Sequence, residues 1–362
     1  MMKINELMKN LNEIAPFKDS EEWDNTGLLV GDNQAEITGV LTALDCSLAT
    51  VDEAIENNLN TIVSHHPLIF PKVTSITDNF YGRIIRKLIK NDINLITMHT
   101  NLDHQPNGVS HMIAEALGFS ETEILIPKKY ELKKLRVNIP KEDKEDLKEG
   151  LSRGGVGNQG DYSECFFEYP VTGQFRPNED ANPHIGTNNT LEIVDEYIVE
   201  AVFDSGKQDE VIDALLKSHP YEEPAFGIFT INNVPNKGLG VKFVYNDTLD
   251  SLIKILEEKM KQPVVNVVKG NDDIISTVGI IGGSGMGYAN EAFKAGVDVL
   301  ITGDVKYHEA YDAKMLQRNI IDAGHYLEAF MREGLETLIR NKTDLKVVSS
   351  KVDTNPFQKK TI

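Results

Sequence analysis

Cysteine is nearly absent from this chain, whose 362 residues include only Cys46 and Cys165. Two cysteines this far apart cannot build a framework of several disulfides, and they lack the short spacing of a cysteine zinc site. A chain with so little cysteine is typical of a reducing compartment, so we expect a cytoplasmic protein.

Long apolar runs are missing as well. No stretch of about 18 consecutive apolar residues occurs, so we expect no transmembrane helix and no membrane partner. Residues 1–17 carry charges throughout and predict an amphipathic helix rather than a secretion signal. Hydrophobic residues still make up 40% of the sequence, which is enough for a sizeable core.

Basic residues are in the minority, with 37 Lys and Arg against 56 Asp and Glu and a formal charge of −19. An acidic surface repels the phosphate backbone, so nucleic acid is not an expected partner. A net negative charge is still compatible with a local basic pocket that binds a small phosphorylated ligand. The simpler alternative is an acidic surface that keeps the protein soluble.

The two ends of the chain alternate strand and helix patterns, which predicts an α/β fold with mostly parallel sheets. Strands are expected at 39–45, 61–64, 93–98, 275–281, 297–302, 319–324 and 346–352. Helices are expected at 49–58, 81–92, 108–118 and 325–341, with a polar loop at 99–108. We expect residues 1–129 and 236–362 to form two halves of one core.

The middle of the chain follows a different order. Strands are expected at 135–140, around 165–169 and 171–176, and at 196–204 and 225–231, with helices at 141–153 and 207–219. We interpret this as a βαββαβ, ferredoxin-like domain inserted at 130–235. Residues 128–129 and 235–238 have the polar, breaker-containing composition of linkers.

Two adjacent histidines, His65 and His66, follow the predicted strand 61–64. Ligand sites of α/β sheets gather at the carboxyl ends of strands. Imidazole suits zinc, iron, nickel or copper, so this strand end is a candidate metal site. The alternative is a pair of polar loop residues at a helix start.

Two further strand ends offer the same kinds of ligand. Asp103 follows the strand 93–98, with His99 and His104 as further candidates or supporting groups, although Asp-rich loops are common. His325 follows the strand 319–324, and Glu328 shares its helix face because the two are three residues apart. A carboxylate can bridge two ions, so we predict a two-metal site of His65, His66, Asp103, His325 and Glu328.

Other polar segments are expected to border the same site. They are Trp23–Asp24–Asn25–Thr26–Gly27, the glycine loop 282–285, which could present N–H groups to an anion, and Thr302–His308 with Asp304, Lys306 and His308. A capped turn and a solvated loop are the simpler alternatives. His308 and Glu328 are the candidate catalytic residues, as proton shuttles.

Together these segments resemble the NIF-three-like family, also known as GTP cyclohydrolase I type 2 homologues. The motifs are Ser64–His65–His66–Pro67, His99–Asp103, Gly303–His308 and Asp322–His325. Two segments of the insert, 173–177 and 219–224, resemble the PII/CutA-like domain of longer members. In many members the glutamate stands four residues after the histidine, whereas here Glu328 stands three after His325 and position 329 is Ala329.

The resemblance implies a centre of two divalent ions, often zinc or iron, held by His65, His66, Asp103, His325 and Glu328. It also implies a toroidal homohexamer, a trimer of dimers. The function we expect is a metal-dependent hydrolase that opens the ring of GTP or hydrolyses another nucleotide or small-molecule ligand. The alternative is a non-catalytic metal-binding scaffold or regulator with a ligand-sensing insert.

Overall fold

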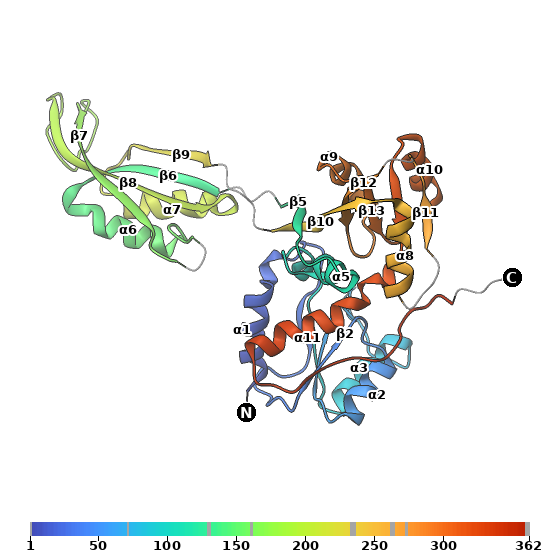
Figure 1. Ribbon diagram of the computed structural model, residues 1–362. Coiled ribbons are helices and arrows are strands. Elements are labelled where there is room, and N and C mark those ends of the chain that lie inside the picture. Colours follow the sequence, from blue (N-terminus) through green and yellow to red (C-terminus); the bar gives the residue numbers. More distant parts are fainter. Residues whose placement is uncertain are drawn as a thin grey trace. The chain divides into compact units, whose positions relative to one another are not determined.

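The computed structural model describes residues 2–70, 72–128, 132–159, 162–231, 237–260, 265–271 and 274–358. The chain divides into two compact units (Figure 1). The discontinuous unit comprises 1–128 with 236–362, and the central unit comprises 129–235. The expected linker residues Lys129, Pro235 and Asn236 lie outside the described residues.

The first sheet of the discontinuous unit has the order β1-β4-β3-β2-β15. Its strands are β1 (Gly27–Val30), β2 (Val40–Ala43), β3 (Thr61–Ser64), β4 (Asn94–Thr97) and β15 (Val347–Ser349). All run parallel to their neighbours except β1, and β15 brings the end of the chain beside β2. The strands β2, β3 and β4 are buried along their whole length, as expected for a sheet covered on both faces.

Helices cover both faces of this sheet. The helices α1 (Ile4–Ile14) and α11 (Met331–Lys342) share a core with one set of strand residues, and α2 (Leu48–Glu56) and α3 (Phe80–Lys90) share a core with the other. The division into two cores follows from the alternation of side chains along a strand, because successive residues point to opposite faces of the sheet. Val40 and Leu41 are neighbours on β2 and belong to different cores.

The second sheet has the order β11-β14-β13-β12-β10-β5. Its strands are β5 (Glu123–Pro127), β10 (Gly238–Asp247), β11 (Asn266–Val268), β12 (Ile275–Ile280), β13 (Val299–Thr302) and β14 (Asn319–Asp322). The helices α5 (Val109–Leu117), α8 (Leu249–Lys259), α9 (Ala289–Lys294) and α10 (Tyr307–Met315) belong to the same half of the unit. Figure 1 shows α5 and α11 in the region between the two sheets, and the core around them draws residues from both sheets.

The prediction of mostly parallel sheets is wrong for this second sheet, which is mixed. Its middle strands β12, β13 and β14 are parallel, whereas β11, β10 and β5 run antiparallel to their neighbours. For the pair β5 and β10 the cause lies in the chain path, because β5 precedes the central unit and β10 follows it. A strand that returns directly beside the departing one runs in the opposite direction.

The central unit contains β6 (Leu132–Pro140), α6 (Lys144–Arg153), β7 (Phe166–Phe175), β8 (Glu192–Asp204), α7 (Gln208–Ser218) and β9 (Phe226–Ile231). Its sheet has the order β7-β8-β6-β9, and the described pairs are antiparallel. Alternate residues of β6, among them Leu135 and Val137, pack on Leu147 of α6 and Leu215 of α7.

Two local predictions differ from the structure. The strands expected around 165–169 and 171–176 are one strand, β7, because Pro170 is tolerated on an edge strand. The polar loop expected at 99–108 contains a short helix, α4 (Thr100–Asp103).

The segment that carries His325 and Glu328 is also different from the prediction. Residues His325–Phe330 form a 3-10 helix before α11 begins at Met331, where one continuous helix was expected. Residues three apart eclipse each other on a 3-10 helix, so this change brings the side chains of His325 and Glu328 closer to one line. Among the described residues, no helix has both the length and the apolar character needed to cross a membrane.

Candidate metal centre

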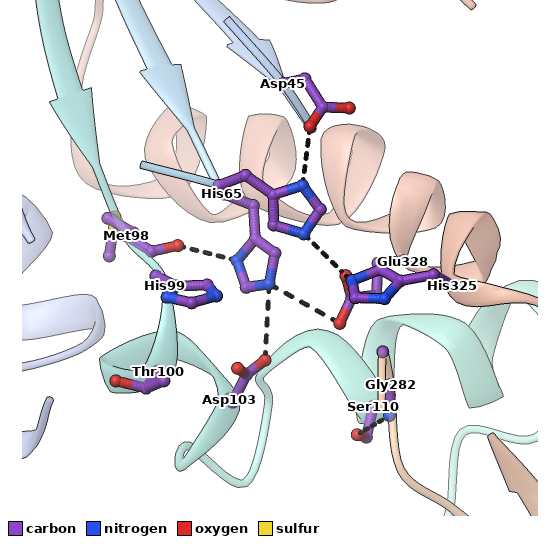
Figure 2. A network of polar contacts seen from close by, with 12 residues as sticks. Asp45, His65, Met98, His99, Thr100, Asp103, Ser110, Gly282, His325 and Glu328 are labelled. Atoms are coloured by element: carbon purple, nitrogen blue, oxygen red, sulfur yellow. Dashed lines mark hydrogen bonds and ion pairs between the residues drawn. The ribbon is translucent and has the colours of Figure 1, made fainter. Parts of the chain in front are cut away.

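In the described part of the discontinuous unit, four histidine rings gather where strands of the two sheets end (Figure 2). His65 and His66 follow β3, His99 follows β4, and His325 follows β14. The ring centroid of His65 lies 5.1 Å from that of His99 and 5.2 Å from that of His66, and the centroid of His66 lies 5.3 Å from that of His325. Elements of both sheets therefore build one cluster.

Every one of these rings has its Nδ1 atom hydrogen-bonded to an oxygen outside the cluster. The pairs are His65 with the carbonyl of Met98 at 2.8 Å, His66 with Asp45 at 2.7 Å, His99 with Asp24 at 2.8 Å and His325 with Asp304 at 2.6 Å. An acceptor at Nδ1 fixes the orientation of the ring and favours a proton on that nitrogen. The same arrangement leaves Nε2 as the available ligand atom, as in many metal-binding histidines.

The Nε2 atom of His65 is buried without a hydrogen-bond partner among the described residues. The residue is 1% exposed, and the nearest charged oxygens are Oδ1 of Asp103 at 3.7 Å and Oε1 of Glu328 at 3.8 Å. Both distances are too long for a hydrogen bond. A buried polar atom without a partner is costly, and a cation among these atoms would satisfy it.

Glu328 lies at the middle of the cluster and is 4% exposed. Its Oε2 lies 3.0 Å from Nε2 of His66 and 3.2 Å from Nε2 of His325, whereas Oε1 faces His65. Glu328 therefore presents one oxygen to each side of the cluster.

The glycine loop makes room for this carboxylate. A Cβ on Gly283 would stand 2.5 Å from Oε1 of Glu328, and the backbone there has a φ of +60°. The N–H groups of Gly282 and Gly285 donate to the hydroxyls of Ser110 and Thr302 at 3.2 and 2.8 Å. These two N–H groups are thus engaged within the chain, in contrast to the anion site considered from the sequence.

The charges of the cluster depend on one another. Burial opposes protonation of His66, but its bonds with Asp45 and Glu328 raise its pKa to about 10. The bond with Glu328 raises the pKa of His325 to about 9. Burial opposes ionisation of Glu328, yet the surrounding histidines hold its pKa well below the usual range. Burial raises the pKa of Asp103.

The ligand atoms form three overlapping groups within which all atoms lie less than 4.8 Å apart. In the described part of the chain, these are His65 with His66 and His99, His66 with His325 and Glu328, and His65 with Asp103 and Glu328. The structure thus brings together His65, His66, Asp103, His325 and Glu328, and it includes His99, one of the two further candidates. These donors, histidine nitrogens and carboxylate oxygens, suit zinc or iron.

Other residues that the sequence suggested for the site lie outside the histidine cluster. His308 is exposed on α10, where its ring contacts Tyr307, and Lys306 is exposed. His104 lies 3.2 Å from Glu21 through Nε2 and contacts the carbonyl of Asp19 through Nδ1, so its ring is engaged outside the cluster.

Asp24, Asp45 and Asp304 have a role that the sequence did not predict, because each holds Nδ1 of one histidine. Burial raises the pKa of Asp24, but its bonds with His99 and Thr100 together outweigh burial and hold this pKa at about 2. Asp45 follows the end of β2, which pairs with β3. This position at a strand end next to His65 and His66 could have indicated from the sequence that Asp45 belongs to the site. Asp304 was expected to border the site, and the structure places its carboxylate on Nδ1 of His325.

A cavity of about 550 Å³ opens beside the cluster. His66, His325, Asp45 and Asp304 contribute to its lining. Aromatic walls come from Phe80, Tyr81, Tyr326 and Phe357. The cluster is therefore accessible to a small molecule, because a cavity of this size accommodates typical ligands.

Comparisons with known proteins agree over nearly the whole chain. Proteins called GTP cyclohydrolase 1 type 2 homolog from Staphylococcus aureus and Staphylococcus epidermidis are 44% and 41% identical to it, over 99% of this chain and all of theirs. The crystal structure of a Staphylococcus aureus protein superposes with a TM-score of 0.82 at 41% identity, covering 99% of both chains. That of a Bacillus cereus protein related to NIF3 gives 0.72 at 35% identity with the same coverage. Residues 2–356 match the family described as Duf34/NIF3 (NGG1p interacting factor 3), and this chain belongs to that family.

Proposed function

We propose that this chain holds two divalent metal ions, zinc or iron, and is a hydrolase of the kind that its relatives' names suggest. The observation that carries the proposal is the shared orientation of four histidines. Each has an acceptor on Nδ1 and presents Nε2 to one space that also contains two carboxylates. Histidines at a protein surface do not as a rule share one orientation. Histidines that bind a metal almost always have an acceptor on the other ring nitrogen.

The ligands can be assigned to the two proposed ions by the oxygen of Glu328 that they face. His65 and Asp103 lie on the Oε1 side, and His66 and His325 lie on the Oε2 side. Glu328 would serve both ions, and His99 is placed to add a further nitrogen near His65 and His66. Catalytic centres leave positions for water or substrate, and this ligand set is small enough for two ions to do so.

Bound ions of this kind would lower the pKa of water from 15.7 to about 7, which makes hydroxide available at neutral pH. The chain's own residues supply position and charge. Asp45 and Asp304 hold the rings of His66 and His325 at the edge of the cavity. His308 remains our candidate for moving protons; it is exposed on α10 and is not among the residues that line the cavity.

The cavity suits a planar heterocycle better than a chain of phosphates. Its walls include Phe80 and Tyr81, and among the described residues no Lys or Arg lines it. Aromatic walls favour contact with a ring. The ring-opening reaction on guanine is therefore compatible with this site, whereas the triphosphate of GTP finds no Lys or Arg among the described residues there and only the imidazoles of His66 and His325.

The test is formate release by the metal-loaded protein, with GTP and guanosine as parallel substrates. We expect turnover that a chelator stops and that His66→Ala abolishes while the protein remains folded. A proton-transfer role for His308 predicts a smaller loss in His308→Ala, about 10²- to 10⁴-fold. Cleavage of a phosphoester without formate would keep the hydrolase class and remove the guanine assignment.

A non-catalytic role is the second candidate, and the observation in its favour is a separate cavity in the central unit. We propose that residues 130–235 are an inserted ferredoxin-like domain that binds a ligand of its own, in line with the strand order β7-β8-β6-β9. Bound metal without turnover on any nucleotide or phosphoester would favour this role. A chain with a short linker in place of 130–235 should still bind metal, because every proposed ligand lies outside the insert.

We also propose, from the family resemblance, a cytoplasmic homohexamer arranged as a trimer of dimers. Light scattering of the purified protein tests this directly. A mass of six chains supports it, and a stable monomer contradicts it.

A further inference from the structure

Two segments of the central unit play no part in the metal centre, yet both contribute to one cavity of about 610 Å³. The segment Gly173–Pro177 includes the end of β7, and the segment His219–Pro224 follows α7. A cavity of about 300–1,000 Å³ is typical of small-molecule sites. The place where these two segments meet is therefore a candidate site that is independent of the metal ligands.

A buried carboxylate lies in the lining of this cavity. Glu196 of β8 is 5% exposed, and its oxygens accept hydrogen bonds from the hydroxyl of Tyr221 at 3.0 Å and from the amide of Asn138 at 3.2 Å. Both donors are neutral, and among the described residues no cationic side chain forms an ion pair with Glu196. A carboxylate offers about four acceptor positions, so capacity remains for a ligand.

The surroundings hold this carboxylate in place. Nε2 of His219 donates to the carbonyl of Asn138 at 2.7 Å, and its Nδ1 accepts from the N–H of Tyr221 at 3.0 Å. These bonds connect His219, Asn138, Tyr221 and Glu196 in one closed network. A Cβ on Gly173 would stand 2.5 Å from Oε2 of Glu196, so the glycine leaves room for the carboxylate.

The walls and rim indicate the kind of ligand. The ring of Tyr221 lies 5.8 Å from that of Phe175, centroid to centroid, and both line the cavity. The acidic residues Asp180, Glu222 and Glu223 contribute to the lining, together with Arg176. Aromatic rings favour a planar ligand, and the excess of carboxylates disfavours an anionic one.

We propose that this cavity binds a small planar molecule with two adjacent N–H donors, which bond to Glu196 while its flat face packs against Phe175 and Tyr221. Paired N–H groups match a carboxylate in a two-point contact. Two sources share this chemistry, an amino-substituted heterocycle such as a guanine nucleoside and an alkyl guanidine.

The experiment is calorimetric titration of the full-length, chelator-treated protein with guanosine and, separately, with agmatine. Inosine lacks the second N–H donor and butylamine lacks the planar group, so they are the matched comparison ligands. We expect guanosine or agmatine to bind at least about tenfold more tightly than its comparison ligand, as for loss of one hydrogen bond to a charged group. The probe that binds identifies the source.

Variants locate the binding. Glu196→Gln keeps the shape of the side chain and should weaken binding at least about tenfold. Glu200→Gln is the matched control, because Glu200 lies on the same strand and bonds to Lys134 and Tyr169, outside the cavity lining. Phe175→Ala should also weaken binding of the probe. This variant is the second test of the proposal if Glu196→Gln does not fold. Failure of both probes to bind, or equal binding by the wild type and the folded variants, would overturn the proposal.

Discussion

Glu328 and His65 come together from opposite ends of the chain, with Oε1 of the carboxylate 3.8 Å from Nε2 of the ring, a buried atom without a hydrogen-bond partner in the described part of the chain. The other oxygen of Glu328 lies 3.0 Å from Nε2 of His66. One carboxylate thus reaches both sides of the cluster. This position makes Glu328 the residue on which both proposed ions depend.

The first prediction compares Glu328 with Asp103. Asp103→Asn should lose one ion and retain the other, because Asp103 belongs only to the group on the His65 side. Glu328→Gln should lose affinity for both. Elemental analysis after equal metal loading measures the difference, with Glu333→Gln, an exposed change on α11, as the control. Full retention of both ions in Glu328→Gln would rule out its shared role.

The second prediction concerns Asp45, which holds Nδ1 of His66 at 2.7 Å without belonging to the ligand groups. Asp45→Asn should lower metal affinity about 10- to 100-fold, as for other supporting acceptors, without changing the number of ions at saturation. Competition with a chelator measures the affinity. Asp52→Asn on α2 is the control, since Asp52 pairs with Lys87 instead. Unchanged affinity in Asp45→Asn would show that the ring needs no such support.

The third prediction tests the close approach of the glycine loop to Glu328. Gly283→Ala introduces a Cβ that would stand 2.5 Å from Oε1 at a φ of +60°. The left-handed backbone alone costs about 1–2 kcal/mol of stability, and displacement of Glu328 should also weaken metal binding. Gly287→Ala is the control because its Cβ would meet nothing within 4 Å. Urea unfolding and metal titration of both variants check this, and equal behaviour of the two would contradict it.

The fourth prediction is a pH dependence in the central unit. Burial lowers the pKa of His219 below its usual value of 6.5, so the unfolded chain binds this proton more readily than the folded one. Stability contributed by neutral His219 is therefore present above about pH 6.5 and is lost as the pH falls below it.

Hydrogen exchange of amides in β6 and β8, corrected for the intrinsic rate, measures this effect. Between about pH 7.5 and about pH 5.5, the wild type should lose more opening free energy than His219→Gln, which has no imidazole to protonate. His184→Gln, a change at a more exposed ring that is the smallest of the contributions to the pKa of His219, should keep most of the wild-type dependence. A wild-type slope in His219→Gln would contradict the assignment.

Most of the residues that the structure brings into the cluster could be named from the sequence for a simple reason. Short apolar strands followed at once by His or Asp are visible in the residues themselves, as at Ser64–His65 and Asp322–His325. Parallel strands place such ends on one edge, which groups His65, His66 and His99 on the first sheet, whereas His325 follows a strand of the second sheet and joins them through a tertiary contact. The 3-10 helix at His325 was not predictable, because the helical pattern of the segment fits either form.

The remaining features depend on tertiary contacts. The position of Asp45 after β2 suggests a place near the site, but the acceptor roles of Asp24 and Asp45 are assigned only when the distance to a particular Nδ1 is known. The pairing of β5 with β10 joins segments on either side of the central unit, and no local pattern reports it. The sequence predicted two strands on either side of Pro170 where the structure has the single strand β7. Proline is tolerated there because β7 is an edge strand, and the position of a strand in its sheet is not visible in the local sequence.

The central claim is that the cluster around Glu328 is a centre for two ions. Elemental analysis of the wild-type protein, stripped with a chelator and reloaded with zinc or ferrous iron, tests it most directly. Two ions per chain, both lost together with His65→Ala and His66→Ala combined, is the result that we predict. A single ion per chain at saturation, or none, would contradict the claim.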